Sequence, residues 1–229
     1  MLRKHLRLRS KYMRPKLQIA LDVLSIDAAK EILTSEVVRD IDIIEVGTLL
    51  LASEGKKAVQ DIRKYIGEDK LLVADFKIAD GAAVMAEMFF DMGADLTTVI
   101  AAANKVSMKK AHDIAQCVGK QIQIELYGVW DYKMAQSWYD IGIRHVIFHH
   151  ARDGKHMWNE EDVAKVKTLC EMGFCVSVTG GISEEVINLF RGIPVYAFIV
   201  GRSFYQSDNI IKTISRYQKA IDDYHIESL

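Results

Sequence analysis

Short runs of apolar, often β-branched residues recur at regular intervals along the chain. Their hydrophobicity is nearly continuous rather than alternating, which is typical of parallel strands that are covered on both faces. Eight strands are therefore predicted, at residues 17–22, 42–47, 71–76, 96–101, 122–126, 145–149, 174–180 and 196–201.

The segments between these runs carry helix signals. The stretch "SIDAAKEILTSEVVRD" begins at Ser25, a residue type that caps helices, and has apolar residues at helical spacing. The stretch "SEEVINLF" begins in the same way at Ser183. Repeated strand–helix units in a chain of this length predict an α/β fold, a (β/α)₈ TIM barrel with a single domain over residues 15–229. A doubly wound open sheet is the alternative, but the even spacing favours a closed barrel.

The composition is that of an ordinary globular protein, with 50% hydrophobic and 27% charged residues. The net charge of -1 gives no reason to expect a nucleic-acid partner. No apolar run approaches the roughly 18 to 20 residues that a membrane helix needs. Residues 1–14 are basic and lack the apolar core of a secretory signal, so they are expected to be a disordered tail or a segment foreign to the natural protein. Three cysteines without metal-type spacing indicate free thiols in a cytoplasmic protein.

Polar side chains collect at the carboxyl ends of the predicted strands. In a barrel these ends meet at one rim, where barrel enzymes carry their active sites. A single polar residue there could be a loop cap, but one at almost every strand end indicates a site. The residues are Asp22, Glu45, Asp75, Lys77, Glu125, His149, Thr179 and Arg202.

The last two strand ends have the features of a phosphate site. The stretch "VTGGIS" supplies Thr179, Gly180 and Gly181, and "VGRSF" supplies Gly201 and Arg202. Backbone N–H groups in such turns and the arginine side chain bind anionic oxygens, and barrels frequently hold a phosphate between the last two strands. A phosphate ester is therefore the expected substrate.

Lys77 lies between Asp75 and Asp80 in "VADFKIADG". Schiff-base chemistry requires a neutral amine, whereas flanking acids favour the ammonium, so Lys77 is predicted to be a fixed cation that stabilises an oxyanion. Glu45 would converge with Asp75, and two such carboxylates either share a proton or hold a cation. Mg²⁺ is the expected ion because it binds carboxylates together with substrate oxygens. A plain ion-pair cluster around Lys77 is the alternative.

The stretch "FHHARD" offers an acid for proton transfer. His149 ends its strand, and Arg152 follows three residues later. A histidine near neutrality can pass a proton, and an arginine can order a water molecule or an anionic oxygen. The neighbouring His150 is expected to be a loop residue.

Together these residues resemble the orotidine 5′-monophosphate decarboxylase suprafamily of barrels, and within it the 3-keto-L-gulonate 6-phosphate decarboxylases. The resemblance runs from about Leu17 to the C-terminal helix. Its anchor is the D-x-K-x-x-D motif of Asp75, Lys77 and Asp80. Glu45 stands where the metal-dependent members carry a carboxylate, whereas the pyrimidine decarboxylases carry a lysine and use no metal.

Two arginines separate these decarboxylases from hexulose-6-phosphate synthase, which shares most of the motif. The synthases lack the arginine three residues past the histidine, and their last strand ends without the arginine of "GRS". The chain has both, as Arg152 and Arg202. The resemblance therefore implies a carboxy-lyase that converts 3-keto-L-gulonate 6-phosphate into L-xylulose 5-phosphate and CO₂, in L-ascorbate and pentose catabolism.

The resemblance also implies a role for each residue. Mg²⁺ would be held by Glu45 and Asp75, and Lys77 would stabilise the enediolate that remains when CO₂ departs. Asp22 and Asp80 would contact the substrate, with Asp80 reaching into the site of the neighbouring subunit in a homodimer. Glu125 would orient Lys77 or the substrate. A proton would be delivered through water by His149 and Arg152. The phosphate would be held by Thr179, Gly180, Gly181, Gly201 and Arg202.

Two other functions remain open from the sequence. A hexulose-6-phosphate synthase activity would join formaldehyde to ribulose 5-phosphate through the same kind of metal-stabilised enediolate. A non-catalytic sugar-phosphate binding protein on an inherited barrel belongs to another class, and it is disfavoured because every expected catalytic position is filled.

Overall fold

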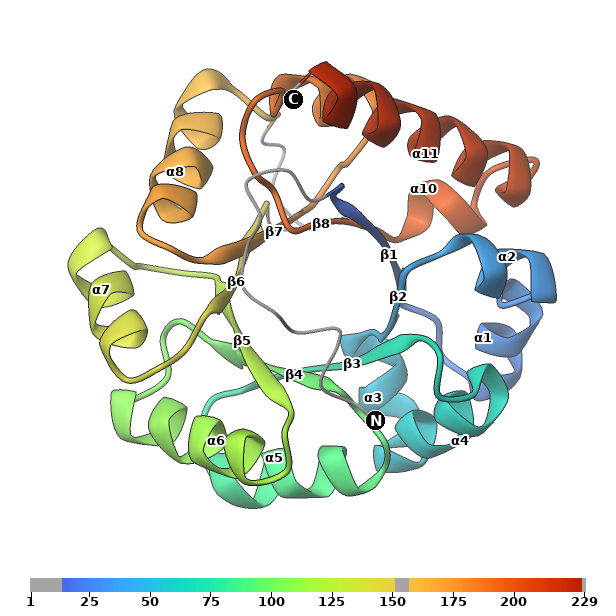
Figure 1. Ribbon diagram of the computed structural model, residues 1–229. Coiled ribbons are helices and arrows are strands. Elements are labelled where there is room, and N and C mark those ends of the chain that lie inside the picture. Colours follow the sequence, from blue (N-terminus) through green and yellow to red (C-terminus); the bar gives the residue numbers. More distant parts are fainter. Residues whose placement is uncertain (1–13, 151–156, 228–229) are drawn as a thin grey trace.

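The computed structural model describes residues 14–150 and 157–227. Parallel strands close into a barrel in the order β1 to β8, and the helices form an outer layer around it (Figure 1). The (β/α)₈ barrel predicted from the sequence is confirmed. The strands are β1 (Lys16–Leu21), β2 (Ile43–Val46), β3 (Leu71–Ile78), β4 (Leu96–Ile100), β5 (Gln121–Leu126), β6 (His145–His149), β7 (Cys175–Thr179) and β8 (Ala197–Val200).

The helices alternate with these strands along the chain. The first two strand-to-strand connections carry two helices rather than one. The helices are α1 (Ile26–Ile32), α2 (Ser35–Asp40), α3 (Thr48–Glu54), α4 (Lys56–Ile66), α5 (Ala82–Asp91), α6 (Lys105–Cys117), α7 (Tyr132–Asp140), α8 (Glu160–Glu171), α9 (Glu184–Leu189), α10 (Arg202–Tyr205) and α11 (Ile210–Glu227).

The helical segment predicted after Ser25 is divided into α1 and α2. Ser25 caps α1 as expected, since its Oγ accepts a hydrogen bond from the N–H of Ala28 at 3.2 Å. The break comes at Thr34, whose Oγ1 accepts from the N–H of Val37 and so begins a second helix. A threonine inside a helical pattern can compete for backbone N–H groups, which is why the pattern alone did not show the break.

Side chains that alternate along the strands fill the barrel interior in layers. Part of the interior near the amino ends of the strands is an apolar layer. On β3, the residue two places beyond the buried Val73 is Asp75, and positions two apart on a strand face the same way. The interior therefore changes from apolar to charged within one pleat, and a polar cavity can form at the carboxyl mouth. The apolar layer consists of Ile43, Val73, Leu96 and Ala197.

The end of β3 departs from regular strand geometry. Its pairing with β4 shifts register between Ala74 and Ile78, and Lys77 has a φ of 55°. Left-handed backbone costs a non-glycine residue roughly 1–2 kcal/mol, so neighbouring contacts must hold it. Of the non-glycine residues that the structure describes, Lys77 alone has a positive φ. The strain is therefore located at the lysine that the sequence singled out.

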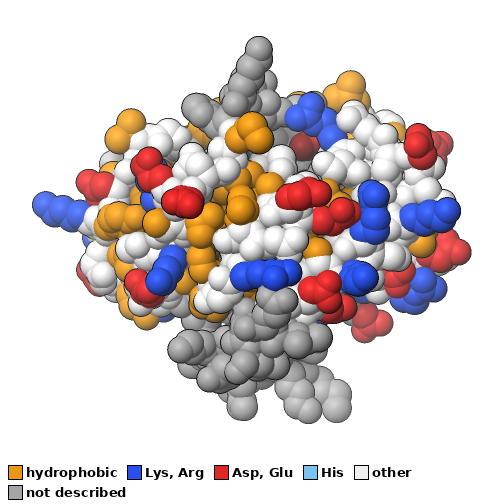
Figure 2. All heavy atoms as spheres, turned by 90° about the horizontal axis from the view of Figure 1, so that it is seen from above, with side chains coloured by type: hydrophobic (Ala, Val, Ile, Leu, Met, Phe, Trp, Pro, Cys, Tyr) orange, Lys and Arg blue, Asp and Glu red, His pale blue; other side chains and the backbone are white. Residues whose placement is uncertain are grey.

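The predicted tail at residues 1–14 lies outside the described residues, except for Arg14. The guanidinium of Arg14 donates to Asp222 Oδ1 at 2.6 Å and lies 3.5 Å from Asp42 Oδ2, so this residue packs on the barrel. Acidic and basic side chains are mixed on the face of the outer layer in Figure 2. Within the described ranges, no helix has both the length and the apolar character needed to cross a membrane.

Candidate active site

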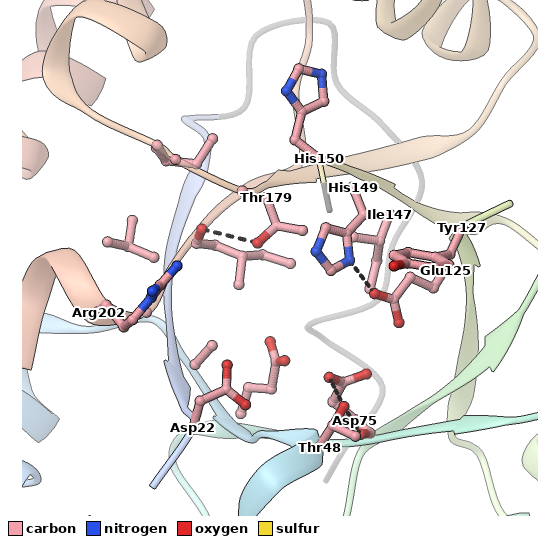
Figure 3. Close-up of a pocket in the computed structure, with 18 of the residues that line it drawn as sticks. Asp22, Thr48, Asp75, Glu125, Tyr127, Ile147, His149, His150, Thr179 and Arg202 are labelled. Carbon is pink, nitrogen blue, oxygen red and sulfur yellow. Dashed lines mark hydrogen bonds and ion pairs between the residues drawn. The ribbon is translucent and has the colours of Figure 1, made fainter. Parts of the chain in front are cut away.

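A cavity of about 560 Å³ opens at the carboxyl mouth of the barrel. Figure 3 shows its lining, with Arg202 on the side opposite Glu125 and Tyr127. The structure brings together in this cavity nearly all of the residues that were predicted to form the site. They are Asp22, Glu45, Asp75, Lys77, Glu125, His149, Thr179, Gly180, Gly181, Gly201 and Arg202.

Lys77 is the cation at the centre of a group of acids. Its Nζ lies 2.5 Å from Asp75 Oδ2 and 3.1 Å from Glu125 Oε2, and it donates to Thr48 Oγ1 at 2.7 Å. Burial alone would favour the neutral amine, but the charges of Asp75 and Glu125 outweigh it and raise the pKa of Lys77. A strongly held ammonium cannot act as a Schiff-base nucleophile, and it suits a fixed positive charge that stabilises an oxyanion.

Asp75 is buried, and both of its carboxylate oxygens accept hydrogen bonds. Burial by itself would raise the pKa of Asp75, but the Lys77 ammonium and the donated hydrogen bonds hold that pKa below its usual value. Thr98 Oγ1 donates to Oδ1 at 2.8 Å, and Thr48 Oγ1 donates to Oδ2 at 2.7 Å. The carboxylate is therefore ionised and fixed in orientation.

Glu45 lies on the neighbouring strand and is also buried. Burial and repulsion from Asp75 raise the pKa of Glu45 well above its ordinary value. Gln18 Nε2 donates to Oε2 of Glu45 from inside the barrel. The carboxylates of Glu45 and Asp75 thus lie at one rim, and the charge of Asp75 disfavours ionisation of Glu45. A divalent cation bound to both would offset this repulsion.

The two carboxylates, Glu45 and Asp75, suit Mg²⁺ better than they suit a metal ion whose ligands all come from the protein. Among the described residues, no group of three or more His, Cys, Asp and Glu side chains is placed to hold a metal. Mg²⁺ commonly binds one or two carboxylates and takes its other oxygens from substrate and water. Glu45 and Asp75 therefore fit the predicted magnesium site, whose remaining ligands would come from substrate and water.

Glu125 connects Lys77 to the predicted acid. Its Oε1 is hydrogen bonded to Nδ1 of His149, while Oε2 pairs with Lys77. Burial and the charge of Asp75 raise the pKa of Glu125, although His149 and Lys77 oppose that shift. The ring of Tyr127 meets the His149 ring edge-on, with centroids 5.7 Å apart. With Nδ1 held by Glu125, the other ring nitrogen of His149 is left to serve the cavity.

The end of the cavity where a phosphate was predicted is built from two turns. Thr179 ends β7, and its Oγ1 donates to the carbonyl of Ile199 on β8 at 3.4 Å. Gly180 has a φ of 94°, and a Cβ there would lie 2.2 Å from the carbonyl oxygen of His150. Glycine is therefore required at residue 180. Arg202 follows β8 and lines the same side of the cavity (Figure 3).

Two predicted residues are not part of this cavity as described. Asp80 is exposed and does not line the cavity of its own chain, so its role across a dimer stays a prediction. Arg152 lies outside the described residues. His150 is a loop residue as expected, because it directly follows the end of β6. It also lines the cavity, and its Nε2 lies 3.1 Å from Asp162 Oδ2.

Sequence reasoning missed three residues that organise the charges. Gln18, Thr48 and Thr98 each bind one of the carboxylates. Thr48 could have been noticed, because it follows the "EVG" end of the second strand at the rim. A glutamine on an inward face and a threonine within an apolar strand give no comparable signal, since threonine is an ordinary strand residue.

Comparison with known proteins shows the family. Residues 15–217 match the model of the orotidine 5′-phosphate decarboxylase / HUMPS family. The chain belongs to this family. It is 40% identical over 210 residues to the 3-keto-L-gulonate-6-phosphate decarboxylase UlaD of Escherichia coli O17:K52:H18. The matched region covers 90% of this chain and 96% of that protein.

Solved structures agree with this membership. The crystal structure of KGPDC from Streptococcus mutans in complex with a pentose 5-phosphate has a TM-score of 0.89 and 37% identity, and the match covers 93% of this chain and 99% of that one. The 3-hexulose-6-phosphate synthase of Salmonella typhimurium is more distant in sequence. It has a TM-score of 0.84 and 26% identity, over 92% of this chain and 100% of that one.

Proposed function

We propose that the chain decarboxylates 3-keto-L-gulonate 6-phosphate to L-xylulose 5-phosphate and CO₂, a step of L-ascorbate catabolism. The observation that carries the proposal is the Lys77 ammonium, which is held between Asp75 and Glu125 inside the cavity. Relatives with 40% identity over most of their length bear the name of this decarboxylase. The complex of the Streptococcus mutans protein with a pentose 5-phosphate supports a sugar phosphate as the ligand class.

The chemistry requires stabilisation of negative charge. The substrate is a β-keto acid, so the bond between its carboxylate and the adjacent carbon breaks, CO₂ departs, and the electron pair stays on the sugar as an enediolate. Lys77 lies where an ammonium can face this developing oxyanion. Because Asp75 and Glu125 fix its position beforehand, little reorganisation is needed in the transition state.

A proton must then reach the carbon that lost CO₂. His149 is the donor in this proposal, acting directly or through a water molecule. Its Nδ1 is held by Glu125, which sets the ring orientation and leaves Nε2 as the nitrogen that can pass a proton. Arg152, the predicted partner of His149 in this step, lies outside the described residues.

Magnesium dependence is part of the proposal, with Glu45 and Asp75 as the residues that would hold the ion. When bound, Mg²⁺ acts as a Lewis acid on the oxygens that it coordinates. The phosphate of the substrate would lie at the opposite end of the cavity, against the turn at Gly180 and Gly181 and the side chain of Arg202.

We also propose that the active form is a homodimer to which Asp80 contributes across the interface. Asp80 is exposed, and on the adjacent helices α5 and α6 the apolar side chains Val84 and Val106 are 70% and 62% exposed. Mixing an inactive Asp80→Ala variant with an inactive Lys77→Ala variant should restore part of the activity, because a hybrid dimer has one intact site. No recovery after subunit exchange would refute the shared site.

The test of the proposed function is CO₂ release from 3-keto-L-gulonate 6-phosphate with a Lys77→Ala variant. Loss of a preorganised charge should lower kcat by about 10²- to 10³-fold or more. Lys120→Ala is the matched control, because both lysine side chains are 24% exposed and each pairs with an aspartate. Lys120 and its partner Asp95 directly precede β5 and β4, and neither lines the cavity. The proposal is wrong if Lys77→Ala decarboxylates as fast as wild type.

A further inference from the structure

Trp158 lies just outside the cavity and contacts the predicted phosphate turn. Its side chain is partly buried, and its indole Nε1 donates a hydrogen bond to the carbonyl oxygen of Gly180 at 2.7 Å. Trp158 is not among the residues that line the cavity, whereas Gly180 and Gly181 are. The indole therefore binds the outer side of a turn whose inner side faces the substrate.

This hydrogen bond fixes the plane of one peptide group. No cis peptide bond occurs among the described residues, so the carbonyl of Gly180 and the N–H of Gly181 point in opposite directions. With the carbonyl directed at Trp158, the N–H of Gly181 is directed away from the indole. Within the described part of the chain, the N–H of Gly181 donates no hydrogen bond, which leaves it available to an anionic oxygen.

The turn needs the hydrogen bond from Trp158 because two consecutive glycines can adopt many backbone conformations. Gly180 and Gly181 have φ values of 94° and 64°, and glycine populates many other conformations at little cost. An unsupported Gly-Gly peptide could rotate and present its carbonyl to the phosphate instead. A carbonyl dipole facing an anion is repulsive, so the orientation of this peptide decides whether the turn binds phosphate.

The indole is itself held in place from the opposite side. The His150 ring stacks on Trp158 with centroids 4.0 Å apart and an interplanar angle of 7°. His150 Nε2 lies 3.1 Å from Asp162 Oδ2, and Asp162 belongs to the capping box that begins α8. Phe190 meets Trp158 edge-on at 5.3 Å. The start of α8 thus anchors the ring that orients the turn.

The role of His150 follows from the same contacts. Figure 3 shows the His149 ring directed toward Glu125, while the His150 ring points away from the centre of the cavity. The N–H of His150 donates to the carbonyl of Thr179 at 3.0 Å, so its backbone is fastened to the strand that precedes the turn. His150 therefore connects β6 and β7 beside the predicted phosphate turn.

We propose that Trp158 is a positioning residue for the phosphate group, acting through the Gly180–Gly181 peptide and held by His150. The inference deepens the proposed function, since it rests on a phosphate that binds at this turn. It assigns a role in substrate affinity to a residue that does not touch the substrate.

The test compares wild type with Trp158→Phe, which keeps an aromatic ring and removes the indole N–H. Calorimetric titration with L-xylulose 5-phosphate and with inorganic phosphate should show about tenfold weaker binding of both, as expected for one lost hydrogen bond to an oriented group. In steady-state assays KM should rise by a similar factor with a smaller change in kcat. The affinity for phosphate-free L-xylulose should not change.

Trp138→Phe is the control for loss of an indole elsewhere, because Trp138 is buried on α7 and does not line the cavity. It should lower stability without changing phosphate affinity. His150→Ala removes the stacked ring and should also weaken phosphate binding, so it decides the matter if Trp158→Phe does not fold. Folded variants that bind both phosphate ligands as tightly as wild type would overturn the proposal.

The binding titrations separate this inference from the proposed function. Weakened binding of L-xylulose 5-phosphate in Trp158→Phe supports the positioning role even if wild type releases no CO₂ from the keto acid. Fast CO₂ release by a Trp158→Phe variant with unchanged KM supports the decarboxylase and rejects the role of Trp158.

Discussion

The hydroxyl of Thr98 joins the carboxylate of Asp75 to the backbone of Lys77, and its removal should loosen the position of Lys77. Thr98 lies on β4 and is fully buried. Its Oγ1 donates to Asp75 Oδ1 at 2.8 Å and accepts from the backbone N–H of Lys77, also at 2.8 Å. That N–H belongs to the residue with the left-handed backbone. Thr98→Val keeps the shape of the side chain and loses both hydrogen bonds.

The magnitude follows from the two groups left without a partner. A buried N–H or carboxylate oxygen that loses its partner costs about 1–3 kcal/mol, so Thr98→Val should lower the free energy of unfolding by about 2–6 kcal/mol. Lys77 can recover some of this cost by leaving its strained backbone conformation. That relaxation would displace Nζ, and a displacement of about 1 Å at a reacting group can reduce the rate by about 10²-fold.

The assay measures CO₂ release and urea unfolding on the same preparations. Thr97→Val is the matched control, because Thr97 is the neighbouring buried threonine and donates to the neutral carbonyl of Ala74 at 2.9 Å. It should lose about 1 kcal/mol of stability and retain kcat. Thr98→Ser should restore activity. A Thr98→Val variant that retains kcat and loses no more stability than Thr97→Val would refute this role of the Thr98 hydroxyl.

Three further predictions concern other parts of the barrel. Arg63→Ala should destabilise the fold by roughly 3 kcal/mol in urea unfolding but leave the KM of folded protein unchanged, because it removes the buried arginine of a 2.5 Å ion pair with Asp95, and neither residue lines the cavity. Glu45→Gln should weaken magnesium binding, titrated by calorimetry with L-xylulose 5-phosphate present, by about 100-fold, since outer-shell changes alone cost about 10- to 100-fold. Gly180→Ala should weaken inorganic phosphate binding in calorimetry by at least about tenfold, because its Cβ would lie 2.2 Å from the His150 carbonyl oxygen in an already left-handed backbone. Unchanged stability, magnesium affinity or phosphate affinity, respectively, would contradict these expectations.

The sequence predicted the barrel and most of the site for one physical reason. A parallel strand that is buried on both faces is apolar along its length, so a charged residue at its carboxyl end, such as Glu45 or Asp75, is conspicuous. The two glycines after β7 are conspicuous in the same way, because both have positive φ values that suit glycine. Strand ends and turns therefore carry their signal within a few residues.

Contacts between distant residues left no such signal. The hydrogen bond from Trp158 to Gly180 joins residues 22 apart, and Thr98 meets Asp75 across 23 residues. Both hydrogen bonds depend on how neighbouring strands and loops pack. The sequence pattern alone does not distinguish Thr98 or Trp158 from an ordinary strand or loop residue. The left-handed backbone of Lys77 was equally hidden, since nothing in "DFKI" suggests a positive φ for a lysine.

The central claim is that the cavity stabilises an enediolate formed by loss of CO₂, and one paired assay tests it most directly. Purified protein with Mg²⁺ is given 3-keto-L-gulonate 6-phosphate in one cell, and formaldehyde with ribulose 5-phosphate in the other. We expect fast CO₂ release that EDTA abolishes, with slow condensation in the second cell. Fast condensation with little CO₂ release would contradict the account and make the chain a hexulose-6-phosphate synthase.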